Sequence, residues 1–237
     1  MRTLPVTGVI IAVTTLTTLA RADGLIYQLP DDGAQVRFDT EIKTSTGNEE
    51  STSKGSVTVS SVGVVTVDNE KCRWIEIKMI GNEDGQEQPV IAKVLIPESH
   101  LGKGKSPGEH MLRGWLKEGD AEPKEIRDLN VPEALPLRVF LAGPPKDLRE
   151  LDQEEVDGKL GKLKCAGVSG ENEFDLGDAA VGIRFENRLH EKAPFGLVTG
   201  NWKFELKNSG QIAVAGTFKL TLVDTSTTAL SELPDRK

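Results

Sequence analysis

Runs in which apolar and polar side chains alternate recur along most of this chain. The first spans residues 34–44 and places four side chains on one face: Val36, Phe38, Thr40 and Ile42. Successive side chains of a strand point to opposite faces, so this period of two predicts a half-buried antiparallel strand. Further strands are expected at residues 57–67, 72–80 and 90–96, with polar turns between them. The first third of the chain therefore predicts an antiparallel meander.

The last third of the chain returns to the same alternation. Strands are expected at residues 160–168, 181–190, 195–206 and 212–223. The last of these carries six face-sharing positions in a row: Ile212, Val214, Gly216, Phe218, Leu220 and Leu222. Residues 224–237 are polar and rich in Ser, Thr and Asp, so we expect a loose tail there.

The middle segment, residues 97–158, is rich in proline and charge. A helix is expected to begin near His110, because Met111, Leu112, Trp115 and Leu116 form one apolar helical stripe. A second helical piece is expected at residues 122–130, and a strand at residues 137–141. This segment predicts an insert that packs over or across the sheet.

Eight or nine strands with one apolar face each need a common partner layer. We therefore predict a mainly β fold, a curved antiparallel sheet or partial barrel around a short helical insert. One β-rich domain over residues 23–223 is the expected unit, because β folds of this length often form a single domain.

The first 22 residues have the three parts of a secretory signal. Arg2 provides a positive start, an uncharged stretch covers residues 6–19, and Ala20-Arg21-Ala22 matches a small-x-small cleavage pattern. The alternative is a buried N-terminal strand or helix. The stretch is too short to span a bilayer, and no later stretch is apolar for long enough. The sequence thus predicts a soluble mature domain in the periplasm or outside the cell.

The charge balance excludes one class of partner. Removing residues 1–22 takes away Arg2 and Arg21 and no acid, which moves the net charge from -8 to about -10. Nucleic-acid phosphates demand a basic face, so we expect no nucleic-acid binding.

Two cysteines, Cys72 and Cys165, both fall in expected strands. In an oxidising compartment they are a possible disulfide. The alternative is a pair of buried free thiols packed as small apolar side chains.

Two short motifs resemble catalytic loops but lack required residues. Residues 102–106 resemble a phosphate-binding loop, yet Ser99 stands where a glycine is needed and Pro107 follows where a helix must begin. Residues 167–170 resemble a nucleophile elbow, yet Glu171 replaces the last glycine. Both stretches predict ordinary turns.

The histidines and acids form no local site. His100, His110 and His190 lie too far apart in sequence for a local zinc pair, and a long-range site would need the first two with an acid such as Glu98. Pairs of neighbouring acids lie in polar turns, where both carboxylates stay solvated. We therefore expect no catalytic residue, no metal and no cofactor.

Aromatic residues are few, and they offer one candidate site. Trp74, Trp115 and Trp202 line one pocket or are buried separately in the core. Together with Phe195 and Leu197 they are the candidate apolar ligand face.

Three stretches, residues 163–168, 183–189 and 193–198, carry a family resemblance. They resemble the closing strands of periplasmic lipoprotein-carrier-like half-barrels and related secreted proteins of unknown function. The resemblance implies a curved antiparallel sheet with a helical lid and an apolar concave face. The resemblance identifies no ligand-binding residue in this chain.

Three functions remain open at this point. The first is a non-catalytic binding or carrier module of the envelope, with a lipid or another envelope protein as partner. The second is a structural or protein-interaction domain whose core is filled by its own side chains. The third is a hydrolase whose site is assembled from distant residues.

Overall fold

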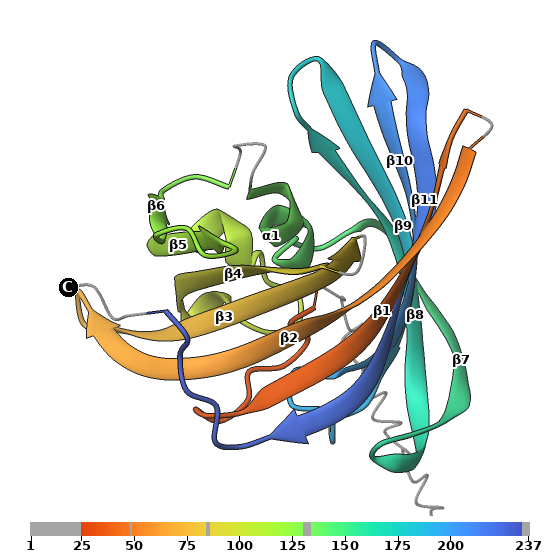
Figure 1. The fold of residues 1–237 in the computed structure, drawn as a ribbon. Coiled ribbons are helices and arrows are strands. Elements are labelled where there is room, and N and C mark those ends of the chain that lie inside the picture. Colours follow the sequence, from red (N-terminus) through yellow and green to blue (C-terminus); the bar gives the residue numbers. More distant parts are fainter. Residues whose placement is uncertain (1–24, 48, 84–85, 130–133, 234–237) are drawn as a thin grey trace, which may run out of the picture.

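The computed structural model describes residues 25–47, 49–83, 86–129 and 134–233, and they form one antiparallel sheet with little helix (Figure 1). The strands are β1 (Gln35–Thr46), β2 (Glu49–Val67), β3 (Glu70–Glu83), β4 (Gln86–Pro97), β5 (Arg113–Glu118), β6 (Lys124–Ile126), β7 (Lys146–Gly158), β8 (Gly161–Asp175), β9 (Ala179–Leu189), β10 (Leu197–Asn208) and β11 (Gln211–Ser226). The other described elements are the 3₁₀ turns η1 (Glu98–His100) and η2 (Pro107–His110) and the helix α1 (Leu135–Phe140).

The eleven strands follow one another in the order β6-β5-β4-β3-β2-β1-β11-β10-β9-β8-β7. The first and last strands of the chain, β1 and β11, thus pair in the middle of the sheet. The sheet is not closed, since β6 and β7 lie at opposite ends of the order. One edge is the three-residue β6, and the other is the thirteen-residue β7.

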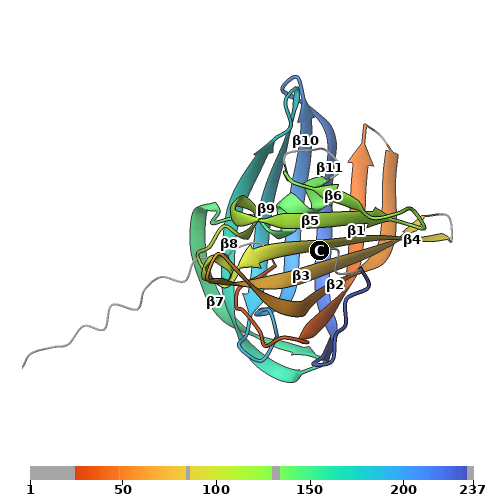
Figure 2. The same ribbon diagram turned by 90° about the vertical axis from the view of Figure 1, so that its left-hand side faces the viewer.

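The sheet is strongly curved. Figures 1 and 2 show β3, β4 and β5 running across the direction of β9, β10 and β11, with α1 in the hollow between the two halves. The predicted mainly β fold, a curved antiparallel sheet or partial barrel with a short helical piece, is confirmed.

Alternation along β1 shows why this sheet has two different faces. Val36 and Phe38 are buried, whereas Arg37 and Asp39 between them are exposed. The buried residues face the hollow that contains α1, and we call their contiguous apolar set the concave core. A burial pattern with period two is expected when only one face of a strand meets a second layer.

The predicted helix over Met111 to Leu116 is wrong. Residues 113–118 form β5, which pairs with β4. Trp115 and Leu116 are both buried because they point to opposite faces of the sheet, Leu116 into the concave core and Trp115 onto the outer face. In a strand that is buried on both faces, adjacent residues are both apolar. Such a pair also fits one apolar stripe of a helix, so the sequence alone did not distinguish the two.

The other two predictions for the insert are also wrong. Residues 124–126, expected to be helical, form the edge strand β6. Residues 137–141, expected to be a strand, lie almost entirely in α1, whose first turn contains Pro136. Proline is tolerated in the first turn of a helix, and a short apolar run does not distinguish a strand from a buried helix.

A second apolar cluster lies on the outer face of β3, β4 and β5. It consists of Cys72, Trp74, Ile91, Leu95, Trp115 and Leu233, and we call it the outer cluster. Leu233 belongs to the segment that was expected to be a loose tail. Instead, β11 continues to Ser226, and residues 227–233, here called the arm, contact the sheet.

Close packing of β2 against β3 gives a stability prediction. A Cβ at Gly55 would lie 2.1 Å from the carbonyl oxygen of Ile80, whereas a Cβ at Gly81, its partner in register, meets nothing within 4 Å. We expect Gly55→Ala to lower the free energy of unfolding by about 1 to 3 kcal/mol, because the backbone must shift. Gly81→Ala, measured beside it by denaturant unfolding, should change that free energy far less. Equal losses would contradict the described strand approach.

Candidate functional site

An aromatic group at the centre of the concave core is the first candidate site. Trp202 of β10 and Phe218 of β11 are direct cross-strand partners, with ring centroids 5.6 Å apart. Phe140 of α1 lies over both rings, at 6.0 Å from Trp202 and 6.2 Å from Phe218. We call Trp202 and Phe218, with Phe185 beside Trp202 on β9, the aromatic floor. The floor faces the hollow of the sheet, and α1 covers it.

A buried polar chain fixes the position of Trp202. Asn187 of β9 is only 1% exposed, and its side-chain Oδ1 accepts a hydrogen bond of 2.8 Å from Trp202 Nε1. Its Nδ2 donates to the hydroxyl of Tyr27, which belongs to the segment that precedes β1. Buried polar groups are costly unless they are hydrogen-bonded. Because these groups bond one another, the surface that the floor presents to α1 is apolar.

Little space remains between α1 and the floor. The cavity there has a volume of about 10 Å³ and is lined by Val139, Asn172, Phe174, Ile183, Phe185, Asn187 and Trp202. Pockets for small molecules have volumes of roughly 300 to 1,000 Å³. In the described conformation the space between α1 and the aromatic floor is therefore filled by the chain's own side chains.

The cover itself is a small element. α1 has six residues and no side-chain cap at its N-terminus, and it buries Leu137 and Phe140. Phe140 O accepts a hydrogen bond from Leu25 N at 3.0 Å, and Leu141 O accepts one from Gly108 N at 3.1 Å. Helices this short are marginal by themselves, so packing and a few backbone bonds hold α1 in place.

The five residues of the predicted apolar ligand face do not share one face. Phe195, Leu197 and Trp202 belong to the concave core, whereas Trp74 and Trp115 belong to the outer cluster. The two outer rings lie 5.3 Å apart and are tilted by 49°. Alternation along residues 72–80 already places Trp74 on the face opposite to Ile75 and Ile77. This signal could have excluded Trp74 from the predicted ligand face. Sequence reasoning missed Phe140, because the run that contains it was assigned to a strand.

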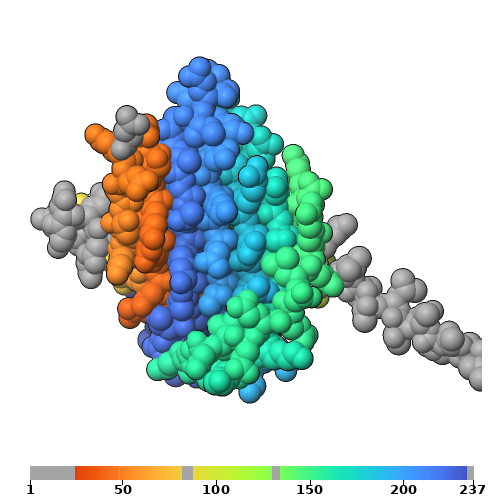
Figure 3. Space-filling view, turned by 90° about the vertical axis from the view of Figure 1, so that its right-hand side faces the viewer, coloured from red at the N-terminus to blue at the C-terminus, as the bar shows by residue number. Residues whose placement is uncertain are grey.

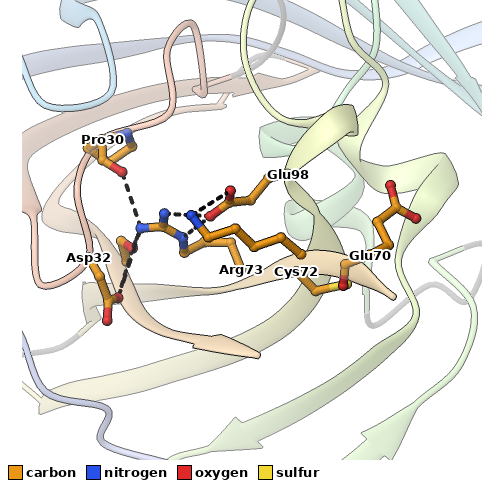
Figure 4. A network of polar contacts seen from close by, with 8 residues as sticks. Pro30, Asp32, Glu70, Cys72, Arg73 and Glu98 are labelled. Carbon is orange, nitrogen blue, oxygen red and sulfur yellow. Dashed lines mark hydrogen bonds and ion pairs between the residues drawn. The ribbon is translucent and has the colours of Figure 1, made fainter. Parts of the chain in front are cut away.

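A buried ion-pair network lies where β3 meets the segment that precedes β1 (Figure 4). Arg73 is 5% exposed, and its Nη2 lies 2.6 Å from Glu98 Oε1. The same guanidinium donates to Pro30 O at 3.2 Å and to Ser61 Oγ at 2.9 Å. Lys71 contacts the other oxygen of Glu98 at 3.0 Å. These contacts join four separate parts of the chain, namely β2, β3, η1 and the segment that precedes β1, so the network holds the fold together and positions no reactive group.

The network predicts how stability depends on pH. Burial acts to raise the pKa of Glu98, but hydrogen bonds from Arg73 and Lys71 outweigh burial and hold the pKa below its ordinary value of 4.5. A carboxylate with a lowered pKa contributes stability above the ordinary value, and this contribution is lost as the pH falls through the lowered pKa.

We expect Glu98→Gln to lower the free energy of unfolding at pH 7 by about 2 kcal/mol, because a charge-assisted bond is lost. The same variant should lose less stability than the wild type between pH 5 and pH 3. Urea unfolding at several pH values measures both effects, with the exposed Glu118→Gln as the control. A variant as sensitive to acid as the wild type would argue against the role of Glu98.

The two cysteines are free and buried. Cys72 belongs to the outer cluster, whereas Cys165 on β8 belongs to the concave core. Five strands separate β3 from β8 in the sheet order. The structure thus contains buried thiols, the second of the two alternatives, in place of the possible disulfide.

Thiol chemistry offers a direct test of these cysteines. Burial raises the pKa of both thiols, and the thiolate is the reactive form. The folded protein should react slowly with an aromatic disulfide reagent at pH 8, and two thiols per chain should react once the protein is denatured without reductant. Fewer than two reactive thiols in the denatured protein would indicate a bond between cysteines.

The histidines that were considered for a long-range site do come together. The rings of His100 and His110 are stacked, with centroids 3.4 Å apart and planes 14° from parallel. Glu98, however, contacts Arg73 and Lys71. Within the described ranges no group of three or more His, Cys, Asp or Glu residues could hold a metal ion.

Ligand-sized hollows lie on the outer face of the sheet, which Figure 3 shows over β1, β11, β10 and β9. One has a volume of about 560 Å³, and nine of its twenty lining residues are charged, including Lys43, Arg184, Lys203 and Glu171. Charges of both signs alternate there, and Arg184 already pairs with Glu171 at 3.1 Å. This mixed surface favours no particular ligand.

Comparisons with known proteins identify no family. No family model matches the chain, and no curated protein matches it. In the part of the chain that the structure describes, no helix has both the length and the apolar character needed to cross a membrane.

Several solved structures resemble the chain in fold at very low identity. A LolA superfamily protein from Nitrosomonas europaea is 9% identical, with a TM-score of 0.30 over 88% of this chain and 90% of that one. An outer membrane lipoprotein-sorting protein domain from Vibrio parahaemolyticus is 11% identical, with a TM-score of 0.32 over 86% and 89%. A protein from Bacteroides fragilis with a YmcC-like fold is 10% identical, with a TM-score of 0.33 over 84% and 99%. The expected resemblance to lipoprotein-carrier-like half-barrels is thus present among these structures.

Proposed function

We propose that this chain is an exported, non-catalytic binding or carrier module whose aromatic floor takes an acyl chain when α1 moves aside. The observation that carries the proposal is the cover: one six-residue helix lies over Trp202 and Phe218. An acyl chain needs an apolar surface without unpaired polar groups. The floor has this character, because both polar atoms of the Asn187 side chain are hydrogen-bonded, one to Tyr27 and the other to Trp202.

Displacement of α1 is what the proposal requires, because the cavity of about 10 Å³ between the helix and the aromatic floor leaves no room for an acyl chain on the floor. Phe140 would leave the space above Trp202 and Phe218, and an acyl chain would replace its contacts. The exchange is favourable only when the acyl chain buries at least as much apolar surface as α1 does. A chain of many methylenes meets this condition, whereas a small polar ligand does not.

Export is supported by the sequence of residues 1–22, which lie outside the described residues. Their order of positive start, uncharged stretch and small-x-small site is typical of a secretory signal. A periplasmic or secreted location belongs to the proposal on this basis, and a lipid or a lipid-modified envelope protein is the partner that it implies.

A second candidate function is a structural or protein-interaction domain with a permanently filled core. The same cavity of about 10 Å³ favours it. The two candidates differ in one measurable respect, which is whether an acyl chain ever contacts Trp202. The third hypothesis is a hydrolase with a non-local site. It stays a prediction, and no structural observation described above favours it.

Contact quenching of tryptophan distinguishes the two candidates. A fatty acid brominated on its acyl chain quenches indole fluorescence only at contact. In the double variant W74F/W115F the remaining indole is Trp202, and we expect this variant to be quenched at saturating fatty acid. W202F keeps the two indoles of the outer cluster and is the matched control, which should be quenched much less.

The outcome decides between the candidates. Quenching confined to Trp202 supports the carrier function. A folded W74F/W115F protein that the brominated chain leaves unquenched would favour the filled structural domain. Native mass spectrometry of the wild type, purified gently from its host, tests the same point without substitutions, since co-purifying lipid is expected.

A further inference from the structure

The arm, residues 227–233, is bound to the outer face of the sheet as a peptide ligand would be. It leaves the end of β11 and crosses to the outer side of β3 and β4 (Figure 1). Its last described residues, Ser231, Glu232 and Leu233, make nearly all of its contacts with β3 and β4.

A buried carboxylate recognises the backbone of the arm. Glu76 of β3 is 4% exposed, and its carboxylate accepts hydrogen bonds from Glu232 N at 3.1 Å and from Leu233 N at 3.3 Å. The hydroxyl of Ser231 also lies within hydrogen-bond distance of this carboxylate, at 2.7 Å. Two successive backbone N–H groups and one hydroxyl thus meet a single acidic side chain.

A buried ammonium recognises the backbone carbonyl. Lys93 of β4 is 0% exposed and is the cross-strand partner of Glu76. Its Nζ donates to Leu233 O at 3.3 Å and lies 5.0 Å from the centre of the Trp74 ring. The Leu233 side chain is 3% exposed and belongs to the outer cluster, which includes Trp74 and Trp115.

These contacts combine hydrogen bonds to the backbone of the arm with burial of one aliphatic side chain. Burying two charged side chains requires their desolvation, and an apolar pair of similar size often stabilises a fold equally well. Sites that bind extended peptides use main-chain hydrogen bonds for affinity and side-chain pockets for specificity, and the arm is held by contacts of both kinds.

The arm contacts the rest of the fold at two places. The first contact is at Ala229, whose N–H donates to Gly33 O at 2.8 Å, and the second begins at Ser231. The arm lines a groove of about 730 Å³ together with Asp32, Gly33 and Val62, and Leu230 between the two contacts is 85% exposed. The arm pairs with no strand edge, so it can leave without breaking the sheet.

We propose that the outer face of β3, β4 and β5 is a peptide-binding site that Ser231–Leu233 occupies in cis. The partner that fits it is a protein with an extended segment in which a hydroxyl residue stands two positions before an aliphatic residue. Release of the arm exposes Trp74, Trp115 and the apolar residues beside them, a patch that monomeric proteins seldom leave open. A partner segment of the same chemistry covers this patch and meets Glu76 and Lys93.

The test uses full-length chains and a fluorescein-labelled peptide of residues 227–237 as the probe. A tethered segment competes at an effective concentration in the millimolar range, so the wild type should bind the probe weakly. Leu233→Ala weakens the competing arm, and we expect this chain to bind the probe about tenfold or more tightly by fluorescence anisotropy. Leu230→Ala alters an exposed leucine of the same arm and should bind as the wild type does.

Two further comparisons test whether Ser231 and Leu233 themselves determine the binding of the probe. Ser231→Ala weakens the arm without emptying the pocket, and its affinity for the probe should lie between those of the wild type and Leu233→Ala. A probe that carries L233D, or one that carries S231A, should bind the Leu233→Ala chain much more weakly than the natural probe does.

Equal affinity of the wild type, Ser231→Ala and Leu233→Ala for the natural probe would overturn the proposal. So would undiminished binding of the L233D probe. Neither result bears on the acyl-chain site, because that site lies on the opposite face of the sheet and is reported by Trp202.

Discussion

Burial of one continuous apolar face of the sheet is the constraint on which the rest of this structure depends. Val36 and Phe38 on β1, like Trp202 and Leu220 on the strands beyond it, are buried only because the sheet curls toward them and α1 fills the hollow. An open sheet cannot cover its own concave face, so this cover must come from other parts of the chain. The segment that precedes β1, η2 and α1 provide it, linked by backbone bonds at Leu25 and Gly108.

The alternation of side chains was sufficient to predict the sheet and insufficient to predict its cover. Residues 34–44 formed β1 as expected because each apolar side chain there meets the same layer. Alternation fails where both faces are buried: Trp115 and Leu116 are adjacent in β5, yet they fill different clusters. It also fails for Phe140, because residues 137–141, which are apolar apart from Arg138, form a run too short to show a period that separates helix from strand.

The sequence likewise indicated some of the candidate site residues and missed others. Trp202, Phe195 and Leu197 all belong to the concave core, although Phe195 precedes β10 and the register of β10 shifts between Leu197 and Thr199. The outer cluster could not be foreseen, because Leu233 reaches Trp74 from a polar segment more than 150 residues away. Contacts of this kind depend on where β11 ends relative to β3, and no local pattern of residues encodes that placement.

The long free edge of the half-barrel has a consequence for how copies of the chain meet. β7 presents thirteen residues, of which Asp147, Glu150, Asp152, Glu154, Glu155 and Asp157 are acidic. Unpaired edge strands invite pairing with other chains, and charged side chains discourage it. Two such edges would bring like charges together, so crowding of identical molecules should not extend the sheet. The fold can thus stay open on one side without becoming a template for fibres.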